Sequence, residues 1–166
     1  MTERGDYQGS GIALVDDKGR VAIPNALRAT LAQNSPRADG KDGGTIVIAV
    51  HEDQPCLVAY DPAYVSALKA ELKTRLELSR GPDGKVDPNI MRNGANGEAV
   101  PFDGSGRFIM PAFPRFHAGI GAHAFFYGVL DLIEIWDPKT LIETTDYPDV
   151  VKSMARFYMS ERGVTL

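Results

Sequence analysis

Short runs of apolar, β-branched residues recur along the chain and are separated by polar turns. "GTIVIAVH" (44–51) and "CLVAYD" (56–61) are two such runs, divided by "EDQP", and they predict a hairpin-like pair of strands. "AFFYGV" (124–129) and "LIEIWD" (132–137) repeat this pattern later in the chain. The hydrophobic pattern therefore predicts a mainly β structure.

Three segments have the spacing of amphipathic helices instead. Asp61 before Pro62 predicts an N-cap with proline at the first helical position, and Asp137 before Pro138 opens a shorter helix in the same way. Behind the first pair, apolar residues follow at helical spacing: Val65, Leu68, Leu72 and Leu76. A last helix is expected over the apolar positions between residues 150 and 158, ending near Gly163.

Two long segments repeat one pattern. "DDKGRVAIPNALRATL" (16–31) matches "DGSGRFIMPAFPRFHAG" (103–119) at Asp16/Asp103, Gly19/Gly106, Arg20/Arg107, Pro24/Pro111 and Arg28/Arg115. These matches lie 87 residues apart, whereas Tyr60 and Trp136 lie 76 apart, so the first copy has eleven extra residues. We expect them in "AQNSPRADGKDGG" (32–44), which has the composition of a surface loop.

Each copy predicts strand, glycine turn, strand, short helix, strand, turn, strand and helix. One copy has too few apolar residues to bury its strands alone, so we expect both to share a barrel-like core with approximate twofold symmetry. The predicted fold class is α+β, mainly β, with short flanking helices. The expected parts are a flexible N-terminus (1–6), a first repeat with its helix (7–78), a linker (79–97), a second repeat (98–144) and a C-terminal helix and tail (145–166).

The glycine–arginine step in each copy is the main candidate for chemistry. Gly19 and Gly106 permit the positive φ of a tight turn, and Arg20 and Arg107 follow directly at the start of the next strand. The planar guanidinium suits phosphate oxygens and the O6 and N7 acceptors of guanine. The alternative is structural: Asp16–Arg20 and Asp103–Arg107 would be exposed ion pairs that stabilise the turns.

Composition and charge limit the other possibilities. The 166 residues include 43% hydrophobic and 24% charged residues, with no long apolar run and no signal-like N-terminus, which predicts a soluble cytoplasmic protein without membrane contact. The net charge of −4 disfavours nucleic acid as a partner. Residues 16–37, however, hold four basic and two acidic side chains, so one positive region is compatible with the acidic total.

No motif for catalysis or metal binding is present. His51, His117, His123 and Cys56 lack the spacing of zinc ligands, and Cys56 lies in an apolar run where a buried hydrophobic role is favoured. Nucleophile-elbow, phosphate-loop and dinucleotide motifs are missing as well. We therefore expect no catalytic residues, metal, cofactor or small-molecule substrate.

Over about residues 7–143, the two copies resemble the MraZ family, which are AbrB-like transcription regulators with tandem repeats. The resemblance rests on Asp-x-x-x-Arg twice, each followed by an apolar run and proline, and on "EIWDP" closing the second copy. It implies swapped-hairpin β folds, ring-like homo-oligomers and a nucleoid location. It also implies binding of double-stranded DNA at short direct repeats in the promoter of the cell-division and cell-wall gene cluster.

Carried over by position, the resemblance makes Arg20 and Arg107 the DNA-contacting residues, with Lys18 beside the first. Asp16 and Asp103 would orient the arginines, and Gly19 and Gly106 would shape the turns. Ser105 replaces the lysine in the second copy. Arg28 and Arg115 favour a structural role at the surface, and Pro114 is expected to shorten or distort its helix.

Two other functions remain as alternatives. An AbrB-like antitoxin would use the C-terminal amphipathic helix to face its toxin, although such proteins typically have one short repeat and a disordered tail. An oligomeric scaffold that has lost DNA binding would use acidic surfaces for protein partners, and the intact Arg20 and Arg107 argue against it.

Overall fold

The structure is a computed structural model that describes residues 3–166. Within these residues the elements follow in this order: β1 (Ser10–Leu14), β2 (Arg20–Ala22), α1 (Asn25–Asn34), β3 (Gly44–Val50), β4 (Leu57–Tyr60), α2 (Tyr64–Leu78), α3 (Asn89–Gly94), β5 (Glu98–Phe102), β6 (Arg107–Ile109), α4 (Ala112–His117), β7 (His123–Gly128), β8 (Ile133–Trp136), α5 (Pro138–Glu143) and α6 (Asp149–Glu161). Strands and helices alternate as the two copies predict, so the α+β class is confirmed.

The strands form a six-stranded sheet with the order β1-β7-β8-β4-β3-β5 and a two-stranded ribbon of β2 and β6. The strand pairs are antiparallel. Exchanging the two copies leaves both orders unchanged, because the first strand of each copy pairs with the third strand of the other. The copies are therefore intertwined. Among residues 3–166 the sheet is open at β1 and β5, so a closed barrel stays a prediction.

The extra residues of the first copy are not confined to the expected loop. Helix α1 has ten residues against six in α4, and the loop that follows has nine residues (35–43) against five (118–122). The β3–β4 loop has six residues against four in β7–β8, and β3 is one residue longer than β7. The expectation that the insertion lies within 32–44 is thus only partly right.

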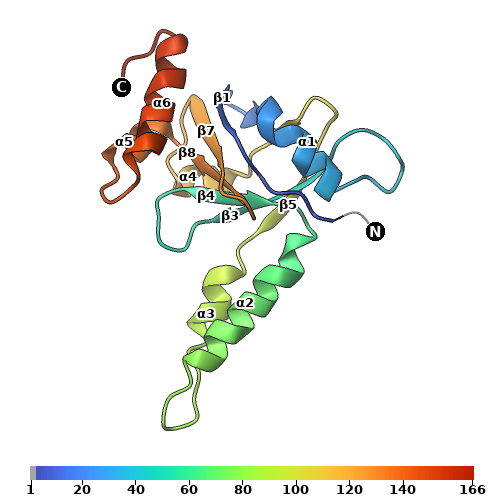
Figure 1. Ribbon diagram of the computed structural model, residues 1–166, viewed down its shortest axis with the longest axis vertical. Helices are drawn as coiled ribbons and strands as arrows, with labels where there is room; N and C mark the ends of the chain where they lie inside the picture. Colours follow the sequence, from blue (N-terminus) through green and yellow to red (C-terminus); the bar gives the residue numbers. More distant parts are fainter. Residues whose placement is uncertain (1–2) are drawn as a thin grey trace.

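Two hydrophobic clusters lie on opposite faces of the sheet. In β7, Ala124 and Phe126 belong to the larger cluster, which also contains residues of α1 and of the β2–β6 ribbon. The intervening Phe125 belongs to the smaller cluster beneath α5 and α6, together with Trp136. This alternation is the period of two that a strand imposes. Figure 1 shows α5 and α6 packed beside β7 and β8 at one side of the molecule.

The two Asp-Pro pairs have different roles. Asp137 caps α5 as predicted, with its Oδ2 accepting a hydrogen bond from the Thr140 N–H at 3.3 Å and Pro138 in the first turn. The N-cap predicted for Asp61 is wrong, because α2 begins later, at Tyr64, and has no side-chain cap. Asp61 instead points into the body of the protein and is fully buried.

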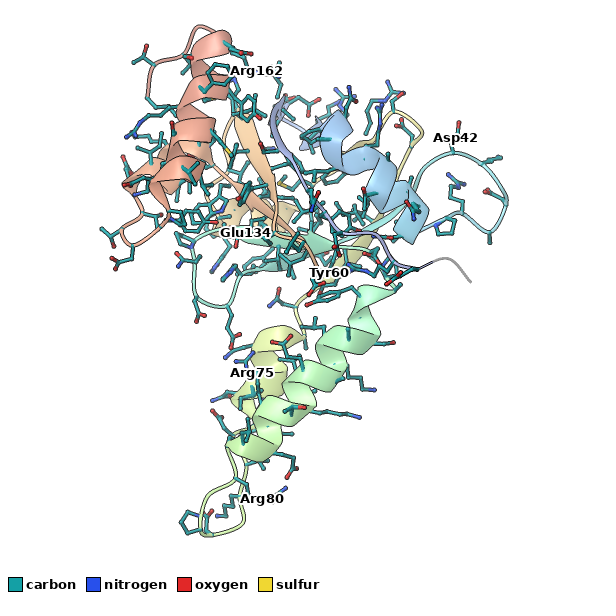
Figure 2. All side chains as sticks on the ribbon, in the orientation of Figure 1. Asp42, Tyr60, Arg75, Arg80, Glu134 and Arg162 are labelled. Carbon is teal, nitrogen blue, oxygen red and sulfur yellow. The ribbon has the colours of Figure 1, made fainter. Side chains whose placement is uncertain are left out.

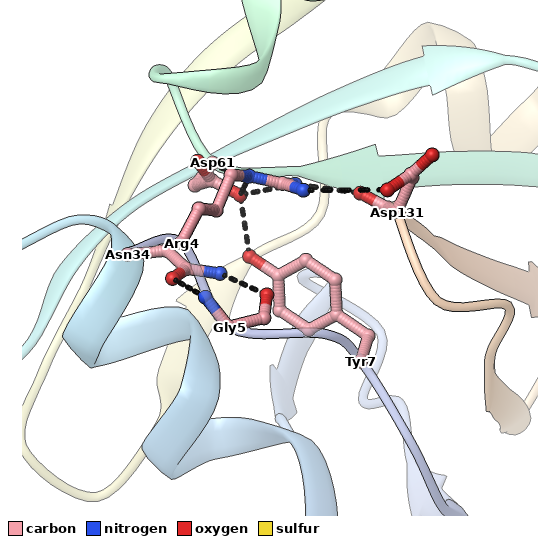
Figure 3. A network of polar contacts seen from close by, with 6 residues as sticks. All are labelled: Arg4, Gly5, Tyr7, Asn34, Asp61 and Asp131. Carbon is pink, nitrogen blue, oxygen red and sulfur yellow. Dashed lines mark hydrogen bonds and ion pairs between the residues drawn. The ribbon is translucent and has the colours of Figure 1, made fainter. Parts of the chain in front are cut away.

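Asp61 is held by residues from the N-terminal segment (Figure 3). Its Oδ1 accepts hydrogen bonds from Arg4 Nη2 and from the Tyr7 hydroxyl, each at 2.6 Å, and Arg4 also donates to the carbonyl oxygen of Asp131 at 2.6 Å. Burial opposes ionisation of Asp61, but the hydrogen bonds from Arg4 and Tyr7 outweigh it and lower its pKa. Of the N-terminus expected to be flexible, residues 1–2 lie outside the described residues, and residues 3–6 include this tie through Arg4.

Helix α4 is short, as expected from Pro114, but for a different reason. Pro114 lies in the first turn, where its missing N–H has no intrahelical partner to lose. The helix ends because Gly119 takes a positive φ of 63° and donates its N–H to Phe116 O. The Ile120 N–H bonds back to Arg115 O, so the chain turns toward β7 directly after α4.

Helices α2 and α3 form an arm that extends away from the sheet (Figure 1). The segment 79–97, expected as a linker, thus contains a helix, and Gly94 lies so close to Leu72 that a Cβ there would overlap it. In the last turn of α2, Arg75 Nη2 is 2.6 Å from Oε1 of Glu52 in the β3–β4 loop. Among residues 3–166, each helix is too short or too polar to cross a bilayer.

Candidate nucleic-acid interface

The turn of the first copy, residues 16–20, is built around one carboxylate. Asp16 Oδ1 accepts hydrogen bonds from the N–H groups of Lys18 (3.0 Å) and Arg20 (2.8 Å), and its Oδ2 accepts from Arg20 Nε at 2.5 Å. The Gly19 N–H bonds to Asp16 O at 3.0 Å. One aspartate thereby closes the turn and orients the guanidinium group of Arg20.

The turn of the second copy, residues 103–107, repeats this arrangement atom for atom. Asp103 Oδ1 accepts from the N–H groups of Ser105 (2.9 Å) and Arg107 (3.0 Å), and Oδ2 accepts from Arg107 Nε at 2.8 Å. Gly19 and Gly106 have φ values of 84° and 78°, as predicted for the turn glycines. The two ion pairs that the structural alternative requires are therefore both present.

The same ion pairs leave part of each guanidinium free. Within residues 3–166, the Nη1 and Nη2 atoms of Arg20 and Arg107 have no hydrogen-bond partner, and the two side chains are 62% and 70% exposed. The hydrogen bond from Arg20 lowers the pKa of Asp16, and those from Arg107 lower the pKa of Asp103. Both aspartates stay ionised at neutral pH, so the arginines remain oriented with two donors each toward solvent.

The prediction that the two turns lie side by side is wrong, because β2 and β6 pair in antiparallel register, with Arg20 opposite Ile109 and Ala22 opposite Arg107, so that the turns lie at opposite ends of one short ribbon. Val21 and Phe108 between them are buried, so the four outer residues share the exposed face of the ribbon. A hollow of about 420 Å³ lies over this face and is lined by Leu14, Arg20, Val21, Ala22, Asp103, Arg107, Phe108 and Ile109.

Each turn is braced by an arginine from the other copy. Arg28 Nη1 donates to Ser105 O at 2.8 Å, and Arg115 Nη1 donates to Asp16 O at 3.1 Å. The backbone does the same, since Ile23 N–H bonds to Gly106 O and Met110 N–H bonds to Gly19 O, each at 2.9 Å. The structural role expected for Arg28 and Arg115 is thus supported, with partners that the sequence did not indicate.

The exposed face of this two-stranded ribbon carries both arginines. The major groove of B-DNA admits a two-stranded β-ribbon, and arginines with two free parallel donors match the O6 and N7 acceptors of guanine. The exposed Lys18 lies only at the first turn, since Ser105 takes its place at the second. Asp17 precedes Lys18, whereas Gly104 precedes Ser105, so the two turns share their arginines and differ in which other charged side chains they expose.

The sequence did not indicate a cluster of one partly exposed and two buried polar side chains. His51, Cys56 and Glu134 place their ligand atoms within 4.8 Å of one another. His51 Nδ1 accepts hydrogen bonds from the N–H groups of Asp53 and Gln54, each at 3.0 Å, which assigns the ring proton to Nε2, 3.6 Å from Glu134 Oε2. A metal at Nε2 would need that nitrogen unprotonated and Nδ1 donating, so this arrangement does not fit a metal ion.

The partners of Glu134 give this cluster a structural role instead. Its Oε1 accepts hydrogen bonds from Trp136 Nε1 at 2.9 Å and from the Tyr147 hydroxyl. Burial and the nearby Glu134 raise the pKa of Cys56, which keeps its thiol protonated. The cluster therefore fastens the α5–α6 connection to β8. The one signal in the sequence was an acidic residue inside the apolar run "LIEIWD".

The C-terminal helix α6 packs its apolar face against the rest of the protein. The apolar face of α6, with Val151, Ala155 and Met159, is buried, and Val151 and Ala155 pack in the cluster that contains Phe125 and Trp136. The antitoxin alternative required this face for a toxin, so the packing of α6 counts against it.

Comparison with known proteins gives a consistent result. No family model matches the chain. The chain is 29% identical over 140 residues to the transcriptional regulator MraZ of Ruegeria sp., covering 82% of this chain and 80% of that protein. It is 26% identical over 156 residues to MraZ of Pseudoalteromonas atlantica (94% and 95%) and 25% identical over 134 residues to MraZ of Yersinia pestis (81% of each). These matches confirm the resemblance seen in the sequence and support placing this chain in the MraZ family.

Proposed function

We propose that this protein is a transcriptional regulator that binds specific DNA sequences through the β2–β6 ribbon. The names of its relatives support the regulatory class. The observation that carries DNA binding is the pair of matching turns, which present Arg20 and Arg107 on one exposed face with their Nη atoms free. Lys18 adds a phosphate contact beside the first turn.

The target that we propose is a set of short direct repeats upstream of the protein's own gene, in the division and cell-wall gene cluster. With two or three basic contacts on a chain of net charge −4, one copy would bind DNA weakly at physiological salt. Several linked copies raise the effective concentration and multiply affinity by roughly 10²–10⁴ when their spacing fits the sites. We therefore propose a homo-oligomer, as the family resemblance implies, located at the nucleoid.

The intertwined strand order supports an AbrB-like, swapped-hairpin architecture for the two repeats. We propose repeats over 7–78 and 98–144, joined through 79–97 and followed by the C-terminal segment 145–166. The names of the relatives give a regulator and no enzymatic activity, and we propose none here.

Fluorescence anisotropy tests this function with a labelled duplex from upstream of the gene and a scrambled duplex of equal length. The wild type is expected to prefer the upstream duplex, and Arg20→Ala and Arg107→Ala to lose that preference. Arg80→Ala is the matched control, because Arg80 pairs with Glu77 at 2.8 Å near the tip of the arm. Equal binding of both duplexes at every salt concentration, or full preference in both ribbon variants, would overturn the proposal.

A further inference from the structure

The two turns differ in what surrounds them. The first turn has Lys18, and the loop of the other copy next to it, residues 118–122, is short. The second turn has Ser105 in place of the lysine, and the nine-residue loop 35–43 lies beside it (Figure 1, cyan beside the yellow turn). A Cβ at Gly104 would lie 2.8 Å from Asp42 Cβ, which shows how closely the loop approaches.

Arg37 on this loop lies near Arg107. The two arginines line one hollow of about 340 Å³ together with Val100, Pro101, Phe102, Asp103, Phe108 and Ile109. Four of these residues, including Arg107 and Ile109, also line the hollow over the ribbon. The two hollows are therefore adjacent, and Arg37 lines the one that flanks the proposed DNA-binding face.

Arg37 is oriented by the same device as the ribbon arginines. Asp39 Oδ1 accepts from the N–H of Lys41 (3.1 Å) and from Arg37 Nε (3.2 Å), and Oδ2 accepts from Arg37 Nη2 at 2.9 Å. The bond from Arg37 lowers the pKa of Asp39. Among the described residues Nη1 of Arg37 has no partner, so the side chain, 38% exposed, keeps one outward donor.

We propose that Arg37 contacts a DNA phosphate and gives the second turn the cationic contact that Ser105 does not provide. This inference rests on the proposed function. Because Asp39 occupies two of the guanidinium nitrogens, Arg37 is suited to a single phosphate oxygen and not to the two acceptors of a guanine. A ribbon lying in the major groove has a phosphate backbone on each side, and Arg37 and Lys18 each flank one turn. Lys41 adds positive charge to the loop, and Asp42 opposes it.

The test is the dependence of affinity on salt, measured by anisotropy with the upstream and scrambled duplexes. The logarithm of the binding constant falls as log salt rises, and each neutralised phosphate contact adds about 0.9 to the steepness of this fall. Arg37→Ala is expected to weaken binding of both duplexes and to make this salt dependence less steep by about 0.9. The preference for the upstream duplex is expected to persist. In the double variant, Ser105→Lys is expected to restore the slope.

Arg80→Ala is again the control, since Arg80 is bonded to Glu77 and lies near the tip of the arm, far from Asp42 in Figure 2. Circular dichroism melts of each variant verify that the fold is kept. If Arg37→Ala has the slope of Arg80→Ala while Arg107→Ala loses the preference for the upstream duplex, the inference on Arg37 is wrong and the proposed function stands. If Arg20→Ala and Arg107→Ala also bind like the control, the proposed function itself fails.

Discussion

The two copies of the repeat are nearly equal at the β2–β6 ribbon and in the pairing of the larger sheet, and unequal in the helices and loops around them. At the ribbon, the first aspartate, the glycine before the arginine and the arginine of each turn make the same hydrogen bonds, whereas Gly104 replaces Asp17 in the second turn. Outside it, the arm of α2 and α3 follows the first copy, whereas α6 packs against the sheet after the second. Equivalence is kept where both copies build one surface, and it is absent where each copy has its own neighbours.

Asp61 and Asp137 occupy equivalent positions in the two copies and have different partners. Asp61→Ala would leave the Arg4 guanidinium without its buried partner and is expected to lower the free energy of unfolding by about 3 kcal/mol. Asp137→Ala removes a helix cap and is expected to lower it by about 1 kcal/mol. Urea denaturation of both variants measures the difference, and equal losses would show that burial of Asp61 has no special weight.

The Asp61 ion pair also predicts a dependence of stability on pH. Its pKa in the folded state is lowered, so its stabilising effect is present above the unfolded pKa of about 3.9 and is lost as pH falls through the folded value. The stability difference between wild type and Asp61→Asn is therefore expected to shrink below about pH 4. A series of urea midpoints between pH 7 and pH 3 tests this, and a constant difference would contradict it.

Replacing the turn glycines tests whether the turns are equally strained. Alanine at Gly19 or Gly106 would hold a side chain at positive φ, which costs about 1–2 kcal/mol. At Gly106 the new Cβ would also lie 2.7 Å from Arg28 Cδ, whereas at Gly19 it meets the backbone oxygen of Met110 at 3.0 Å. Thermal melts are expected to show losses of similar size, and no loss in either variant would argue against a required left-handed turn.

The cross-bracing arginines test whether each turn depends on the other copy. Arg28→Ala removes one hydrogen bond to Ser105 O and is expected to cost about 1 kcal/mol. In DNA binding, its effect should be non-additive with Arg107→Ala and additive with Arg20→Ala, because it supports only the second turn. A double-mutant cycle measured by anisotropy separates these, and the reverse pattern would mean that Arg28 acts elsewhere.

The smallest expected effect comes from the position that is Lys18 in the first turn and Ser105 in the second. Lys18→Ala is expected to make the fall of log K with log salt less steep by about 0.9, and Ser105→Lys is expected to make it steeper by a similar amount. Neither change should alter which sequence is preferred, because phosphate contacts carry little sequence information. A change of preference in Lys18→Ala would instead indicate that this lysine contacts bases.

Local features of the molecule were predictable from the sequence, and distant ones were not. The turn at Gly19 and Arg20 depends on a hydrogen bond between residues four positions apart, so the local sequence pattern predicts its conformation. The bond from Arg28 to Ser105 O joins residues 77 positions apart, and no local pattern indicates it. Asp61 before Pro62 has the pattern of a cap, but tertiary contacts with Arg4 and Tyr7 determine its actual place.

The buried cluster at Glu134 was missed for the same reason. His51 and Glu134 come from different copies, and only the pairing of β4 with β8 brings the two hairpins together. In the sequence, Arg37 is one charged residue of a polar loop. Only the fold shows that it lines the same hollow as Arg107.

In the proposed function, DNA lies on the face of the ribbon that carries the two arginines. A photocrosslinking amino acid at Ala22, which is exposed beside Arg107 in the strand register, tests it directly against the same probe at Leu78, which is 82% exposed at the end of α2. Crosslinks to the upstream duplex are expected from position 22 and none from position 78. Crosslinks from position 78 alone would place the DNA on the arm and overturn the proposed interface.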